Sequence, residues 1–145
     1  MKVLVIHGPS LDRLGVRDPD HYGSQTLDEV NAHIEKVAGE LGMTVEIHQS
    51  AIEGEIVGLL NGAAGRVAGA VVNPAAYSHT SRAIADAIAA VDYPVIEVHL
   101  SNIHAREPWR RRSVTAESSV GVIAGFKAHS YSLALRALKE IVEGA

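Results

Sequence analysis

The sequence predicts an α/β fold, in which helices cover both faces of a five-stranded parallel sheet. Apolar, β-rich runs alternate with helical patterns along the whole chain, the arrangement of strands joined by helical crossovers. The chain is 47% hydrophobic but has only one Trp, one Phe and four Tyr, so Val, Ile, Leu and Ala should form the core, as in parallel sheets. Its 145 residues suit one domain, residues 1–145, with a sizeable core.

Each expected element has a local signal. A strand comes first, and a capping box of Thr26 and Glu29 opens the first helix, which Gly42 ends as a natural C-cap. Pro94 precedes the apolar run of the fourth strand. The expected strands cover 3–6, 44–48, 69–73, 94–99 and 120–124, and the expected helices cover 26–41, 53–64, 81–90 and 132–143. This alternation favours the flavodoxin-like strand order 2-1-3-4-5.

Two long connections interrupt the alternation, at residues 8–23 and 102–119. Long loops in compact domains are usually lids or binding loops. Both follow strands, so both should lie at the carboxyl edge of the sheet, where open parallel sheets bind ligands. Asn73 and His79 should reach the same edge.

Composition excludes several classes of protein. The net charge of −4 argues against nucleic acid or an anionic membrane as a partner. Cysteine is absent, which excludes disulfides, thiolate metal sites and a cysteine nucleophile. The chain runs directly into its first strand and has no apolar stretch of membrane-spanning length, so we expect no signal peptide and a cytoplasmic location.

Common catalytic motifs are also missing. The loop 8–15 matches neither a dinucleotide-binding nor a P-loop pattern, and no GxSxG elbow is present. Asn73 stands where a receiver domain needs an aspartate. Three histidines could in principle bind a metal, but three arginines nearby would repel a cation, so we expect no metal. These histidines are His79, His99 and His104, and the arginines are Arg17, Arg106 and Arg110.

The segment 96–107, which begins as the end of an expected buried strand, carries the densest group of polar side chains. Glu97 and His99 are two residues apart on an extended chain, so they point to the same side and the carboxylate can orient the imidazole. In the loop 8–23, Tyr22 is a poor base at neutral pH unless a cation stabilises its phenolate, which Arg17 could do. The pattern suits proton transfer on a small anionic substrate.

Structural alternatives remain open at this stage for three of these residues. Tyr22 could be a packing residue of its loop, and Glu97 could pair with a structural arginine. Asn73 could simply cap the loop that follows it. The segment 96–107 could also be an ordinary polar surface loop.

Five motifs, in order and spacing along almost the whole chain, resemble type II 3-dehydroquinate dehydratase. The longest and most specific runs from Glu97 to Glu107. The others are Gly8-Pro9-x-Leu11, Leu14-Gly15-x-Arg17-x-Pro19-x-x-Tyr22-Gly23, Gln49-Ser50-x-x-Glu53-Gly54 and Asn73-Pro74-x-Ala76-Tyr77-x-His79-Thr80-Ser81.

The resemblance implies a flavodoxin-like subunit, a homo-oligomer (a dodecamer built from trimers) and no cofactor. It implies anti elimination of water from 3-dehydroquinate through an enolate, giving 3-dehydroshikimate. Tyr22 would be the base, assisted by Arg17, and His99, oriented by Glu97, would be the acid. The implied substrate-binding residues are Asn73, Leu100 and Ser101 for the carboxylate and His79, Arg110 and a neighbouring subunit's Asp86 for the ring hydroxyls, with Arg106 in support.

The sequence departs from the family pattern in the shell of the expected enolate. Ser10 replaces an asparagine that is linked to an enolate-stabilising water, and His7 replaces a usual asparagine. The segment 126–130 also differs. These departures leave a second hypothesis, a diverged paralogue that binds or transforms another cyclic hydroxy-carboxylate. The sequence does not decide between a biosynthetic and a catabolic role.

Overall fold

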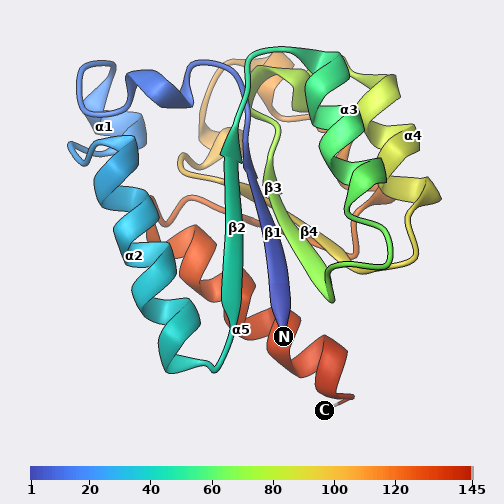
Figure 1. Ribbon diagram of the computed structural model, residues 1–145. Helices are drawn as coiled ribbons and strands as arrows, with labels where there is room; N and C mark the ends of the chain where they lie inside the picture. Colours follow the sequence, from blue (N-terminus) through green and yellow to red (C-terminus); the bar gives the residue numbers. More distant parts are fainter. Residues whose placement is uncertain (145) are drawn as a thin grey trace.

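The structure, a computed structural model, describes residues 1–144. Five parallel strands form one sheet in the order β2-β1-β3-β4-β5, which confirms the predicted order 2-1-3-4-5. Helices α2 and α5 cover one face, and α3 and α4 cover the other (Figure 1). The strands are β1 (Lys2–His7), β2 (Thr44–Gln49), β3 (Gly69–Asn73), β4 (Val95–His99) and β5 (Gly121–Ala124).

The four expected helices are present and differ from the prediction only near their ends, whereas the short helix α1, in the connection after β1, was not predicted. Thr26 caps the helix by accepting a hydrogen bond from the Glu29 backbone N–H at 3.2 Å, as predicted. The last helix begins at His129, three residues earlier than expected. The prediction missed this start because the polar residues of the first turn are buried and obscure the amphipathic pattern. The α-helices are α1 (Pro19–Tyr22), α2 (Leu27–Glu40), α3 (Glu53–Gly62), α4 (Arg82–Ala90) and α5 (His129–Glu143).

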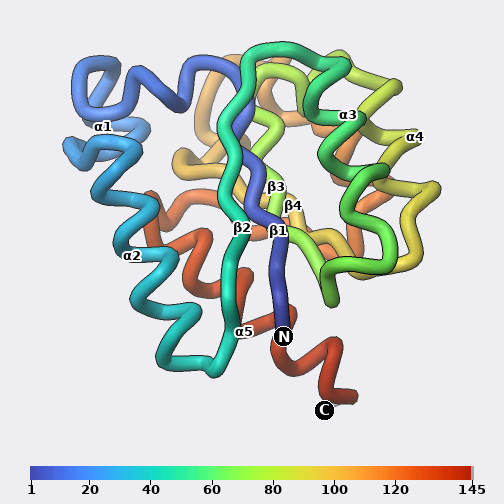
Figure 2. The backbone as a smooth tube through the Cα atoms, viewed as in Figure 1, coloured from blue at the N-terminus to red at the C-terminus, as the bar shows by residue number. Residues whose placement is uncertain are grey.

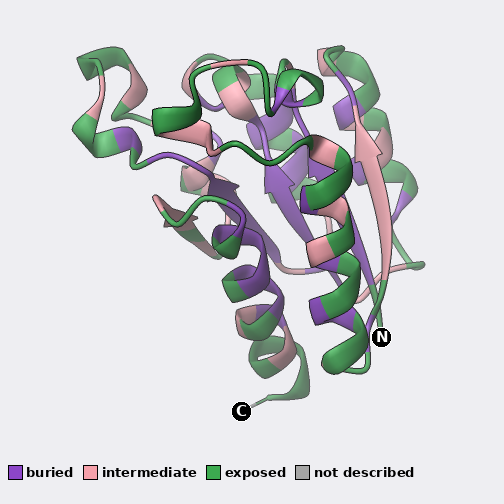
Figure 3. Ribbon diagram, turned by 90° about the vertical axis from the view of Figure 1, so that its left-hand side faces the viewer, coloured by how far each residue is buried: buried purple, intermediate pink, exposed green. Residues whose placement is uncertain are grey.

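The two core layers follow from the alternation of side chains along the strands. In β1, Val3 and Val5 pack against α2 and α5, whereas Leu4 and Ile6 pack towards α3 and α4. The three inner strands β1, β3 and β4 are almost completely buried, and the outer faces of the helices are exposed (Figure 3). Each residue at a strand's carboxyl end therefore reaches the site from a face that its position in the strand determines.

Both termini lie at the amino end of the sheet, and the long connections lie at the opposite edge (Figure 2). The connection after β1 contains a single 3-10 turn, Leu11–Arg13, and the short helix α1. The connection after β4 contains three further 3-10 turns, at Ile103–Ala105, Pro108–Arg110 and Ala116–Ser118. These two segments, with the turn after β3 (Ala75–His79), supply the side chains of the candidate site.

Candidate active site

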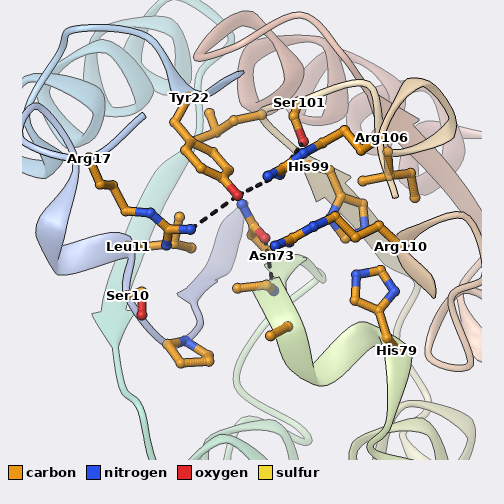
Figure 4. A pocket seen from close by; sticks show the side chains of 15 residues that line it. Ser10, Leu11, Arg17, Tyr22, Asn73, His79, His99, Ser101, Arg106 and Arg110 are labelled. Atoms are coloured by element: carbon orange, nitrogen blue, oxygen red, sulfur yellow. Dashed lines mark hydrogen bonds between the residues drawn. The ribbon is translucent and has the colours of Figure 1, made fainter. Parts of the chain in front are cut away.

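A pocket opens at the carboxyl edge of the sheet, over the ends of β1, β3 and β4 (Figure 4). Its walls combine three arginines, two histidines and a tyrosine, which come from three separate connections and from the end of β4, with the end of β3. The predicted site residues that line it are Ser10, Arg17, Tyr22, Asn73, His79, His99, Leu100, Ser101, Arg106 and Arg110. The structure thus brings together ten of the twelve predicted residues.

Tyr22 ends α1, and its hydroxyl oxygen receives two charged donors. Arg17 Nη2 lies 3.1 Å from this oxygen, and Arg106 Nη1 lies 2.5 Å from it. The same guanidinium carbons stand 4.3 Å and 5.1 Å from the centre of the phenol ring. Two guanidinium groups, which can only donate hydrogen bonds, thus meet at one phenol oxygen. Tyr22 is therefore more than a packing residue of its loop.

Arg106 makes a direct contact that the sequence did not predict. It was expected only to support the site, yet it donates to Tyr22 and lies within 3.4 Å of the Ser101 hydroxyl. Its side chain is 7% exposed and also lies 3.9 Å from a carboxylate oxygen of Asp18. Arg106 therefore ties the loop that carries Tyr22 to the segment after β4. Its position in the longest motif was the only sequence signal for this role.

His99 and Glu97 project from β4 on the same side, as the two-residue spacing predicted. His99 Nε2 donates to Glu97 Oε2 over 2.8 Å, so Nδ1 is the ring nitrogen available to the pocket. Glu97 is fully buried, and among residues 1–144 its only ionic partner is His99. The alternative that Glu97 pairs with a structural arginine is therefore wrong.

Two hydroxyl groups complete the surroundings of Glu97. Ser113 donates to Oε2 over 2.6 Å, and Thr115 donates to Oε1. A buried carboxylate needs such donors because it has left water behind. Sequence reasoning missed both residues, which lie 16 and 18 positions further along the chain. No periodic pattern connects a strand to hydroxyls in an irregular segment.

Asn73, at the end of β3, has a structural role and also lines the pocket. Its Oδ1 accepts from the Ala75 backbone N–H over 3.0 Å, which caps the following turn. Its Nδ2 donates to the Tyr131 hydroxyl over 3.1 Å. Gly8 passes so close that an added Cβ would lie 2.6 Å from the Pro74 carbonyl oxygen, so only glycine fits there.

His79 and Arg110 line the side of the pocket that lies away from Ser10 and Arg17 (Figure 4). His79 Nδ1 donates to the Arg112 carbonyl oxygen over 2.8 Å, which leaves Nε2 as an acceptor in the neutral ring. Burial, and to a smaller extent the positive charges of His99 and Arg110, lower the pKa of His79 below its usual value. Arg110 lies over the Trp109 ring at 4.0 Å and donates to Glu107 over 2.8 Å. Both side chains are therefore held in place before a ligand arrives.

Ser10 lines the pocket in a left-handed conformation, with φ 67° and ψ 0°. The two predicted residues that do not line it are Glu97, which lies behind His99, and Asp86, which is exposed on α4. His7 and Lys127 are not at the site either. His7 is buried in the core, and Lys127 donates to the Asp20 carbonyl oxygen.

Residues 1–144 contain neither a cluster of metal-binding side chains nor a membrane-spanning helix. No group of three or more His, Cys, Asp or Glu side chains is arranged to hold a metal ion. Within the same range, every helix is too short or too polar to cross a bilayer.

Similarity to known proteins identifies the family to which this chain belongs. The family model for class II dehydroquinases matches residues 1–139. The chain belongs to this family. A 3-dehydroquinate dehydratase from Geotalea daltonii is 52% identical over 138 residues, which cover 95% of this chain and 96% of the relative.

A further relative and a solved structure agree with this family. A catabolic 3-dehydroquinase from Aspergillus oryzae is 48% identical over 133 residues, covering 92% of this chain and 87% of the relative. The crystal structure of type II dehydroquinase from Propionibacterium acnes superposes with a TM-score of 0.92 at 43% identity, covering 95% of each chain. The predicted family resemblance and fold class are thus confirmed.

Proposed function

We propose that this dehydroquinase family member is a hydro-lyase that dehydrates 3-dehydroquinate to 3-dehydroshikimate. The observation that carries the mechanism is the pair of guanidinium donors on the Tyr22 oxygen, in the same pocket as an imidazole held by a buried carboxylate. An enolate mechanism needs a base for a weakly acidic C–H and an acid for a poor leaving group. The pocket supplies one group for each task.

In this mechanism the Tyr22 phenolate removes the C2 proton, and the electron pair of that bond forms the enolate of the C3 ketone. The enolate then expels the C1 hydroxyl, which takes a proton from His99 Nδ1 and leaves as water. Glu97 holds the other ring nitrogen and stabilises the protonated imidazole before transfer. The product is a conjugated enone, and solvent returns the proton from Tyr22 to His99.

The remaining residues bind the substrate. Asn73 and the backbone N–H groups of Leu100 and Ser101 are assigned to the carboxylate, since all three residues line the pocket. His79 and Arg110 are assigned to the ring hydroxyls. Ser10 is assigned to the water that meets the enolate oxygen.

Assembly and location belong to the same proposal. Asp86 is exposed and lies outside its own pocket, which suits a role in the site of a neighbouring subunit. We assign the chain to a homo-oligomer, a dodecamer built from trimers, in the cytoplasm. Light scattering on the purified protein tests the assembly, and a fully active monomer would contradict it.

The decisive experiment is the ultraviolet absorbance of the enone formed from 3-dehydroquinate. The wild type should turn over, and Tyr22→Phe should lower kcat by at least about a hundredfold with KM little changed. Tyr77→Phe is the matched control, because its hydroxyl bonds to the Ala51 carbonyl oxygen outside the pocket. A fully active Tyr22→Phe enzyme would overturn the assignment of the base, and an inactive wild type would overturn the reaction.

A further inference from the structure

A chain of buried hydrogen bonds runs from α2, through the core, to the floor of the active site. His7 ends β1 with no exposed surface, and its Nε2 lies 2.7 Å from Asn31 Oδ1 on α2. Its Nδ1 lies 2.8 Å from the hydroxyl oxygen of Tyr131, in the first turn of α5. That hydroxyl in turn lies 3.1 Å from Nδ2 of Asn73, which lines the pocket.

The register of the sheet explains why these groups meet. His7 and Asn73 are direct partners on the neighbouring strands β1 and β3. His7 comes two residues after Val5, and Asn73 comes two residues after Val71. Both valines face α2 and α5, so the side chains of His7 and Asn73 point to the same face. Tyr131, which belongs to α5, is fully buried, and its hydroxyl meets both side chains.

The direction of every hydrogen bond in the chain follows from one fixed donor. The Ala75 backbone N–H can only donate, so the Asn73 atom that it meets is Oδ1, and Nδ2 must face Tyr131. The Tyr131 oxygen accepts from Nδ2, and its single hydrogen is directed to His7 Nδ1. His7 then carries its own hydrogen on Nε2, which matches the carbonyl oxygen of Asn31. All four side chains are satisfied only when His7 is neutral.

We infer that Asn31, His7 and Tyr131 are positioning residues that hold the Asn73 amide with its Nδ2 group oriented for the substrate carboxylate. Asn73 Nδ2 has two hydrogens, and Tyr131 takes one of them, so the other is directed by the same contact. Without the Tyr131 hydroxyl, only the Ala75 contact would orient the amide. The inference deepens the proposed function and rests on its assignment of Asn73.

This series of hydrogen bonds also makes the site sensitive to acid. A proton on Nδ1 of His7 would face the Tyr131 hydroxyl, whose hydrogen would then lose its acceptor. Burial lowers the pKa of His7 to about 4, although the hydrogen bond to Asn31 opposes this shift. The groups that face His7 carry no charge: Asn31 from α2, Tyr131 from α5, whose pKa burial raises, and the register partners Gln49 and Asn73. The series of hydrogen bonds from Asn31 to Asn73 is therefore complete at neutral pH.

The first test is Tyr131→Phe, which keeps the ring and removes the hydroxyl. A misaligned carboxylate contact should raise KM for 3-dehydroquinate about tenfold, with kcat reduced less than about threefold. Tyr93→Phe is the matched control, because it also loses a buried hydroxyl, bonded to the Leu60 carbonyl oxygen far from the pocket. A folded Tyr131→Phe protein with an unchanged KM would overturn the inference.

The second test, Asn31→Asp, replaces only the side-chain nitrogen with an oxygen and so preserves the packing. A carboxylate at Nε2 favours protonated His7, so KM should begin to rise at a higher pH than in the wild type. A purely structural role would leave this pH profile unchanged. Imidazole ¹⁵N NMR reads the His7 tautomer without any substrate: a hydrogen on Nε2 supports the inference, and one on Nδ1 at neutral pH overturns it. This measurement stands even if 3-dehydroquinate is not turned over.

Discussion

Acidification from pH 8 to pH 4 should destabilise the folded chain through the buried imidazole of His7. The pKa of this group is about 4 in the folded chain, against about 6.5 when it is unfolded. As the pH falls through this window the unfolded chain binds the proton first, so the contribution is complete above about pH 6.5 and is lost towards pH 4. At about 1.4 kcal/mol per pKa unit, the loss is about 2 kcal/mol at pH 5 and about 3 kcal/mol at pH 4.

Urea denaturation of the wild type and of His7→Asn, at one protein concentration and several pH values, measures this loss. The variant lacks the titrating group, so its free energy of unfolding should fall about 2 kcal/mol less than that of the wild type between pH 8 and pH 5. Other groups with lowered pKa values, such as His33 and His79, titrate in both proteins and cancel. Parallel pH profiles for the two proteins would show that His7 is not a buried neutral group.

Three further predictions concern the chemistry of the pocket. Arg17→Ala should slow the reaction and move the rate optimum to more alkaline pH, measured as kcat against pH, because Tyr22 then keeps only one cationic donor. Thr115→Val should leave one oxygen of buried Glu97 without its donor, lowering the free energy of unfolding by about 2 kcal/mol in urea and kcat about tenfold. Ser10→Asn should raise kcat up to about tenfold in the absorbance assay, because asparagine tolerates the left-handed backbone and brings an amide donor closer to the enolate; a loss of activity would show a pocket rebuilt around serine.

The fold could be predicted from the sequence because its signals are local and repeated. Apolar runs, the Thr26 cap and the alternation of strands and helices each appear within a few residues, and they gave the strand order that the sheet has. The start of α5 was missed because Ser130 and Tyr131 turn polar groups inwards to meet other buried groups. A helix whose buried face is partly polar lacks the apolar periodicity on which such predictions depend.

Residue spacing alone predicted only those contacts of the candidate site whose partners lie close together in sequence. The pairs Glu97 with His99 and Arg17 with Tyr22 could be inferred from spacing, and both pairs are in contact. The contact of Arg106 with Tyr22 spans 84 positions and depends on how two irregular connections fold over the sheet. No local pattern encodes such a contact, although the family motifs placed both residues at one site.

The alternation of side chains along parallel strands gives this pocket two independent supports. Glu97 and His99 share the face of β4 that the segment 113–118 covers, and hydroxyls from this segment fix the carboxylate. His7 and Asn73 share the opposite face, where Tyr131 joins them. Because the sheet separates the two networks, the proposed acid and the carboxylate-binding amide are held by different sets of residues. Changes in one network should therefore combine additively with changes in the other, as expected for sites without shared partners.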